Sequence, residues 1–183
     1  MIKNTIVQFV CFITNLELDE FIPEWERYAQ KLLTKNAEPA LMQQIATTKC
    51  KFSYISQHEW PERDFHFTFI NDRPSKYFPE NKVKILQTGG YIPVQLKRSS
   101  QVENDDTRLI AFISHNETDI DFYKRLPLYN NLNIYQAYYE SCSYGYVLEF
   151  FVSAMNLDEL MLVLNHRPGV ETGLFKECLV PQV

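Results

Sequence analysis

The predicted order of strands and helices repeats once along the 183-residue chain, and this repeat constrains the fold more than any short motif does. Over residues 5–96, and again over residues 108–180, hydrophobic periodicity predicts strand, helix, strand, strand, helix and strand. The polar tract KRSSQVENDDT (residues 97–107) separates the halves. We therefore expect three segments: a first module over residues 1–97, a linker over 98–107 and a second module over 108–183.

Individual elements follow from the spacing of apolar residues. The runs IVQFVCFI (6–13) and LIAFIS (109–114) are typical of buried strands. After the first run, apolar residues recur at three- and four-residue steps up to Leu33, which predicts a helix with Asp19 as its N-cap. The other expected elements are a hairpin of 51–60 with 64–70, a strand over 83–96 bent at Gly89-Gly90, a short helix within 119–129, a hairpin of 134–142 with 146–153, a helix from Asn156 to Gly169 and a strand over 172–180.

Composition excludes several classes of protein. With 45% hydrophobic and 14% aromatic residues, the chain can bury a large core. Its net charge of -5 and its lack of a Lys/Arg cluster argue against a nucleic-acid partner. No apolar run approaches the roughly 20 residues that cross a bilayer, so we expect no membrane partner. Gln8 interrupts the N-terminal apolar run, which we therefore interpret as a strand rather than a signal peptide.

The four cysteines form no C-x-x-C pair and no zinc-type spacing with histidine. Two of them, Cys11 and Cys178, lie in apolar runs, where a reduced thiol behaves as a small hydrophobic group. The cysteines therefore favour a cytoplasmic protein with free thiols and no structural metal.

Four polar residues in the predicted strands suggest a binding or catalytic site. Glu149 lies in the apolar run YVLEFFV, where a carboxylate needs a partner or a ligand. Strand alternation places His66 and Thr68 on one face, and aligning the two hairpins puts Glu149 on the same side, with Gln8 nearby. We predict Glu149 and His66 as candidate catalytic groups. The alternative is a structural Glu149 that is hydrogen-bonded to a neighbouring tyrosine or histidine.

Ligand-binding candidates are Gln8, Thr68 and Tyr138. Tyr138 belongs to a group of tyrosines that suits either sheet packing or a pocket for a flat organic molecule. The Gly89-Gly90 pair does not open a helix and lacks the spacing of a dinucleotide-binding loop, so we expect no bound nucleotide.

The βαββαβ order of each half is that of a ferredoxin-like module. An α+β fold follows, in which helices cover one face of each sheet and the two sheets pack on each other. Over nearly its whole length, up to the closing strand GLFKECLV (173–180), the chain resembles the dimeric α/β-barrel superfamily in a tandem fused form. Because the fusion would supply both modules, we expect a monomer or a weak homodimer that associates through an edge strand.

The resemblance implies three functions. The first is binding of a small organic molecule in the barrel, as in cofactor-independent monooxygenases or isomerases, with no cofactor. The second is haem binding of the chlorite-dismutase-like or haem-degrading type, whose iron ligand lies on a module's second helix, where His166 is found. His166 also suits the negative end of that helix. The third is a non-catalytic protein-interaction module.

Overall fold

The computed structural model describes most of the chain. The described residues are 5–34, 37–46, 49–61, 74–96, 107–117, 119–126, 132–151 and 157–178. In the N-terminal half the elements are β1 (Thr5–Thr14), α1 (Leu18–Leu33), β2 (Glu38–Ala46), β3 (Tyr54–Pro61), the short 3-10 helix η1 (Pro74–Lys76) and β4 (Val83–Gln95). In the C-terminal half they are β5 (Thr107–Ile113), α3 (Ile120–Lys124), β6 (Leu132–Ala137), β7 (Tyr146–Phe151), α4 (Leu157–Asn165) and β8 (Val170–Glu177).

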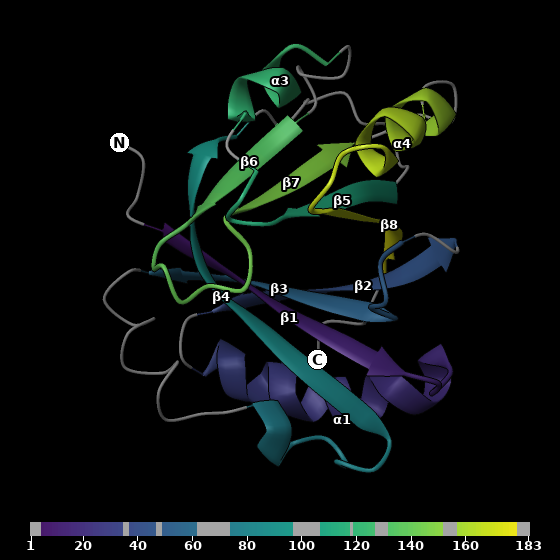
Figure 1. Cartoon of the computed structure of the whole chain (residues 1–183). Helices are drawn as coiled ribbons and strands as arrows, with labels where there is room; N and C mark the ends of the chain where they lie inside the picture. Colours follow the sequence, from purple (N-terminus) through teal and green to yellow (C-terminus); the bar gives the residue numbers. More distant parts are fainter. Residues whose placement is uncertain are drawn as a thin grey trace.

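The eight strands form one closed, antiparallel barrel in the order β1-β3-β2-β8-β5-β7-β6-β4. The N-terminal half supplies the run β4-β1-β3-β2, and the C-terminal half supplies β8-β5-β7-β6. Helix α1 covers one outer side of the barrel, and α3 and α4 cover the opposite side (Figure 1). None of the described helices is long and apolar enough to cross a membrane.

Closure of the barrel corrects two expectations. The sheets of the two halves do not merely face each other, because β2 pairs with β8 and β4 pairs with β6 along two seams. Each described strand therefore has a hydrogen-bonded neighbour on both sides. A closed barrel has no free edge, so the expected association through an edge strand loses its basis in these strands.

Strand β2 is absent from the sequence prediction. Its residues EPALMQQIA combine a proline, adjacent glutamines and little alternation, so the hydrophobic pattern is weak. The sequence instead predicted that residues 51–60 pair with residues 64–70. The segment 64–70 lies outside the described residues. In the structure β3 pairs with β1 on one side and β2 on the other.

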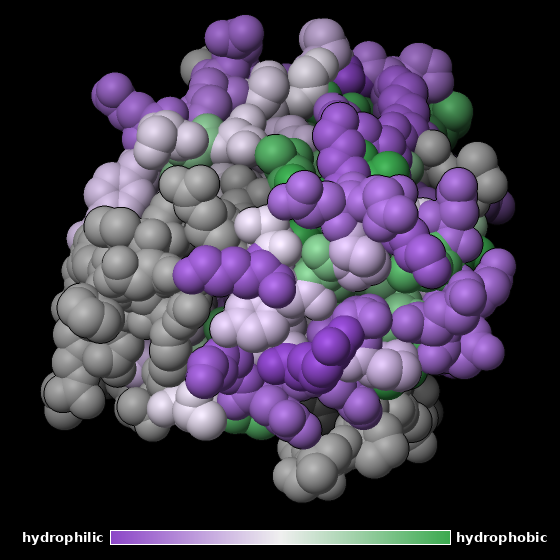
Figure 2. Space-filling view, turned by 90° about the horizontal axis from the view of Figure 1, so that it is seen from below, coloured by the Kyte–Doolittle hydropathy of each residue, from purple (hydrophilic) through white to green (hydrophobic). Residues whose placement is uncertain are grey.

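The N-cap of helix α1 lies two residues earlier than predicted. Glu17 is the N-cap, and its backbone N–H donates to the Glu20 carboxylate at 3.3 Å, while Asp19 lies in the first turn. The buried face, which includes Phe21 and Trp25, packs against β1 and β3. Seen from the α1 side, the molecular surface is mostly hydrophilic, as expected for a helix whose apolar stripe faces the sheet (Figure 2).

The predicted bend at the glycine pair is confirmed. The register between β1 and β4 shifts between Gln8↔Gly90 and Val10↔Gln87. Gly89 has a φ of +114°, and a Cβ there would lie 2.6 Å from the Cys142 Sγ. Only glycine satisfies both the backbone angle and the close approach.

Aromatic side chains fill the centre of the barrel. Phe9 is fully buried, and its ring meets the rings of Tyr91, Phe112 and Tyr135 edge-on at centroid distances of 5.7, 6.5 and 5.4 Å. Two further apolar cores lie on the outer face of the barrel, one between the strands and α1 and one between the strands and the helices α3 and α4. The inner core is therefore a packed layer of rings.

Candidate functional site

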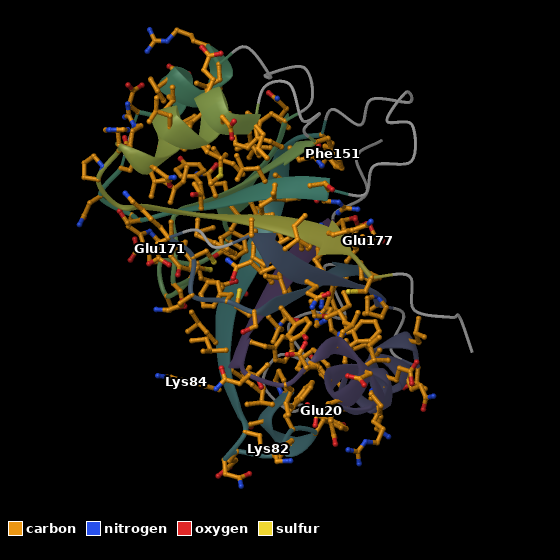
Figure 3. All side chains as sticks on the ribbon, turned by 90° about the vertical axis from the view of Figure 1, so that its right-hand side faces the viewer. Glu20, Lys82, Lys84, Phe151, Glu171 and Glu177 are labelled. Atoms are coloured by element: carbon orange, nitrogen blue, oxygen red, sulfur yellow. The ribbon has the colours of Figure 1, made fainter. Side chains whose placement is uncertain are left out.

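Polar side chains gather inside one end of the barrel, where β5 and β6 begin and β7 and β8 end. We call this set the mouth cluster; its members are Gln57 on β3, Arg108 on β5, Asn133 and Tyr135 on β6, Glu149 on β7 and Glu177 on β8. Strand alternation turns these residues inward, since Leu148 and Phe150, which flank Glu149, pack in the outer core under α3 and α4. Glu177 and Phe151 lie at this end, and Glu171 lies at the opposite end (Figure 3).

Glu149 sits at the centre of the cluster and is only 1% exposed. Arg108 Nη1 donates to its Oε1 at 2.6 Å. Tyr135 O–H and Asn133 Nδ2 donate to its Oε2 at 2.8 and 2.9 Å. The carboxylate thus has an ion-pair partner and two further donors, which is what a buried charge requires. This is the hydrogen-bonded alternative that the sequence left open.

Arg108 links two carboxylates at the barrel end. Besides Glu149 it bonds Glu177, and its guanidinium lies 5.3 Å from the centre of the Phe151 ring. Burial acts to lower the pKa of Arg108, but Glu149 and Glu177 more than offset this, so the net shift of the pKa is upward. The guanidinium is therefore a fixed cation held between two anions.

Tyr135 fixes the directions of the neighbouring hydrogen bonds. Burial, and then the Glu149 carboxylate, raise the pKa of Tyr135 well above its usual value, so the phenol keeps its proton. That proton goes to Glu149, so the phenol oxygen acts only as acceptor for Gln57 Nε2 at 3.4 Å and Asn133 Nδ2 at 3.3 Å. The Gln57 amide is thereby oriented, with its Oε1 pointing away from Tyr135.

Two atoms of the mouth cluster have no hydrogen-bond partner. Among the described residues three buried side-chain atoms are unpartnered, and two of them are Gln57 Oε1 and Arg108 Nε. Gln57 is 7% exposed. A buried polar group without a partner costs about 1–3 kcal/mol, so a water or a ligand that bonded these atoms would stabilise the protein.

The structure separates the residues that the sequence grouped together. Glu149 points into the barrel, but Gln8 lies on the opposite face of the sheet, between β1 and α1. Tyr138 packs against the α1-side core rather than against Glu149. The expectation that Gln8 lies near Glu149 inside the barrel was therefore wrong, and Tyr138 lies apart from the Glu149 network. His66 and Thr68 lie outside the described residues.

Gln8 was assigned to the wrong face because both faces of β1 are apolar. Val7 and Phe9 point into the barrel, whereas Ile6 and Val10 pack under α1. Alternation shows which residues share a face but does not show which face is the inner one.

The residues that sequence reasoning missed are Gln57, Arg108, Asn133 and Glu177. Each is a polar residue at an inward position of its strand, and Tyr135 was noted only as part of a group of tyrosines. Asn133 is the direct cross-strand partner of Glu149, so the pairing register would have identified it.

A second buried polar chain lies between the sheet and α1. Trp25 Nε1 donates to Ser56 Oγ at 2.8 Å, and Ser56 Oγ lies 2.7 Å from His58 Nε2. His58 Nδ1 and Trp60 Nε1 both meet Gln8 Oε1, at 3.3 and 3.1 Å. The order resembles a nucleophile and its base, but Ser56 and His58 are fully buried under α1. Their hydrogen bonds therefore anchor the helix.

Acid should weaken the protein through His58. Burial lowers the pKa of His58 to about 3, whereas an unfolded histidine titrates near 6.5. In this pH range the unfolded chain therefore binds a proton at His58 that the native state does not bind. The free energy of unfolding falls as the pH drops from about 6.5 towards 3, with a loss of about 2 kcal/mol at pH 5. Urea unfolding of the wild type and His58→Gln at pH 7.5 and pH 5 measures this. The variant should lose about 2 kcal/mol less than the wild type over that interval; equal losses would contradict a neutral buried His58.

A separate groove of about 350 Å³ lies at the start of α1, lined by residues that include Asn15, Gln43 and Ser53. Several of its polar groups bond one another: Ser53 Oγ donates to the Thr14 carbonyl at 2.7 Å, and Tyr54 O–H donates to the Leu16 carbonyl at 3.0 Å. Because these groups already have partners, the groove is a weaker candidate than the mouth cluster.

Comparison with known proteins identifies the fold. No protein-family model matches the sequence, and no curated protein is similar to it. Among solved structures, a mutant chlorite dismutase from Candidatus Nitrospira defluvii in complex with cyanide superposes with a TM-score of 0.52 at 7% identity, over 96% of this chain and 92% of that chain. A second mutant of the same enzyme gives a TM-score of 0.52 at 8% identity, over 96% and 93%. The chain thus has the α+β barrel fold of chlorite dismutase.

Proposed function

We propose that the protein binds a small organic molecule at the mouth cluster. The observation that carries this proposal is the pair of unpartnered buried atoms, Gln57 Oε1 and Arg108 Nε, in a network whose other hydrogen bonds are made. The network holds both side chains in place, so a ligand meets an acceptor and a donor whose positions are already fixed.

The proposed site is the mouth of the barrel rather than its centre. The sequence hypothesis placed a pocket within the barrel, but the rings around Phe9 occupy that space. A ligand would instead lie on the outer surface of this ring layer, beside Tyr135. An apolar floor with a few fixed polar groups is the usual composition of a small-molecule site.

Glu149 fits a positioning role better than the predicted role of general base. It already accepts hydrogen bonds from Arg108, Tyr135 and Asn133, and these would have to be rearranged before it accepted a substrate proton. We infer that Glu149 orients Arg108 and Tyr135 towards the ligand. Monooxygenase or isomerase activity stays a prediction that depends on residues beyond this cluster.

We also infer that residues 1–97 and 108–183 are two ferredoxin-like modules fused in tandem, joined by 98–107. The strand orders β4-β1-β3-β2 and β8-β5-β7-β6 support this, since each is the same order within its own half. The short η1 and the short α3 occupy the places where each half would have one of its helices. The mouth cluster draws on both halves, with Gln57 from the first and the other members from the second.

The described residues do not fit a haem group. The His58 ring is enclosed under α1 with both nitrogens engaged, and His115 Nε2 lies 2.7 Å from the Cys142 carbonyl oxygen. His166 is exposed at the end of α4, with its Nδ1 2.6 Å from the Leu162 carbonyl oxygen. The barrel centre is filled with rings. His58 and His115 are thus engaged within the fold and His166 lies at the surface, so the described histidines do not support an iron ligand in the barrel, and we derive no haem chemistry for this chain.

A fragment screen by ligand-observed NMR tests the proposed function. Cationic, neutral and anionic fragments would be tested in equal numbers against the wild type and Glu149→Gln. We expect fragments of at least one charge class to bind the wild type, and binding to weaken about tenfold or more in the variant, because Arg108 loses one of the two carboxylates that hold it in place. The proposal fails if no fragment binds, or if every binder is unaffected by the substitution while circular dichroism shows an intact fold.

A further inference from the structure

We infer that the ligand of the mouth cluster carries a protonated amine, an inference that rests on the proposed function. Among the side chains that the structure describes, three carboxylates lie on the inward face of the strands at this end: Glu59, Glu149 and Glu177. Glu59 shares that face because it is the cross-strand partner of Val7, a residue of the barrel core. At this end Arg108 is the one inward cation among the described strand residues, so the mouth has a surplus of negative charge.

The unpartnered acceptor supports the same ligand class. Gln57 Oε1 is oriented away from Tyr135 by the phenol proton, as described above, and it lies two residues from Glu59 on the same face of β3. A buried carbonyl oxygen beside carboxylates is a binding position for an N–H donor that carries positive charge.

Arg108 does not require an anionic ligand. Its charge is already opposed by Glu149 and Glu177, so an added carboxylate ligand would bring a further negative charge to a mouth that has a surplus. The free Nε–H requires only an acceptor atom. A hydroxyl oxygen elsewhere on the amine would satisfy it without added charge.

The floor of the mouth favours an aromatic body for this amine. Tyr135 contacts the Phe9 ring with centroids 5.4 Å apart, and Phe9 contacts Tyr91 at 5.7 Å. A ring lying on this layer would gain apolar contact while its amine reaches the carboxylates. Tyramine, with one ammonium, one ring and one phenol oxygen, is a probe that has all three features.

Isothermal titration calorimetry at pH 7 with three matched probes tests the inference. Tyramine, tyrosol and 4-hydroxyphenylacetate share a ring and phenol and end in an ammonium, a hydroxyl and a carboxylate. We expect tyramine to bind about tenfold or more tightly than tyrosol, since hydrogen bonds to charged groups contribute about 1.5–3 kcal/mol. 4-Hydroxyphenylacetate should bind most weakly.

The outcomes distinguish this inference from the proposed function. Tighter or equal binding of 4-hydroxyphenylacetate overturns the amine inference and leaves a mouth site intact. If none of the three probes binds, the amine inference fails, and the fragment screen alone decides whether a site exists.

Two variants locate the binding. Gln57→Leu removes the free acceptor and should weaken tyramine binding about tenfold or more, with a smaller effect on tyrosol. Glu171→Gln is the matched control, since Glu171 lies at the opposite end of the barrel and contacts Tyr144 (Figure 3). Its tyramine affinity should equal that of the wild type. An equal loss in both variants, with the fold intact by circular dichroism, would overturn the assignment to the mouth.

Discussion

Replacing Arg108 by leucine is expected to lower the free energy of unfolding by about 3 kcal/mol, because it leaves the Glu149 carboxylate buried inside the barrel without a cationic partner. Glu149 is 1% exposed, and its two remaining donors, Tyr135 and Asn133, do not supply a positive charge. Urea unfolding at pH 7, followed by fluorescence, measures the change.

The control for this experiment removes both charges. Arg108→Leu combined with Glu149→Leu no longer buries an unpaired charge, so the double variant should be more stable than Arg108→Leu alone by about 2 kcal/mol. If the double variant were less stable than the single one, the ion pair would not be the reason for the loss.

Replacing Phe9 by alanine should cost about 3–5 kcal/mol of unfolding free energy, since it opens a cavity in the ring layer at the barrel centre. Phe9 is fully buried and has three edge-on ring contacts, so its neighbours cannot easily close the gap. The matched control is Ile92→Ala on the outside of β4, where the side chain is 40% exposed and the cost should stay near 0.5 kcal/mol or below. Equal costs for the two variants would mean that the barrel centre is not packed.

The sequence predicted those elements whose hydrophobic pattern is strong. Strands β1, β5 and β7 are apolar runs, and α1 has a regular apolar stripe, so each lies close to its expected place. Strand β2 could not be found this way, because its position is set by pairing with β3 and β8 rather than by its own pattern. The repeat gave the order of elements but not the seams that close the barrel.

The site was predictable only in part, for a related reason. Glu149 stood out as a charge inside an apolar run, and it does point into the barrel. Its partners Arg108 and Asn133 come from other strands, 41 and 16 residues away in sequence, and only the register brings them together. Local patterns carry no information on that register unless one face is clearly polar.

The most direct test of an amine-binding site at the mouth of the barrel is side-chain NMR during a tyramine titration. We expect the Gln57 side-chain amide and the Arg108 Nε–H signals to shift together and to saturate at one equivalent of bound ligand. The side-chain amide signal of Gln43, in the groove at the start of α1, should not move. Shifts at Gln43 with unchanged Gln57 and Arg108 signals, or no saturable shift at Gln57 and Arg108, would contradict the account.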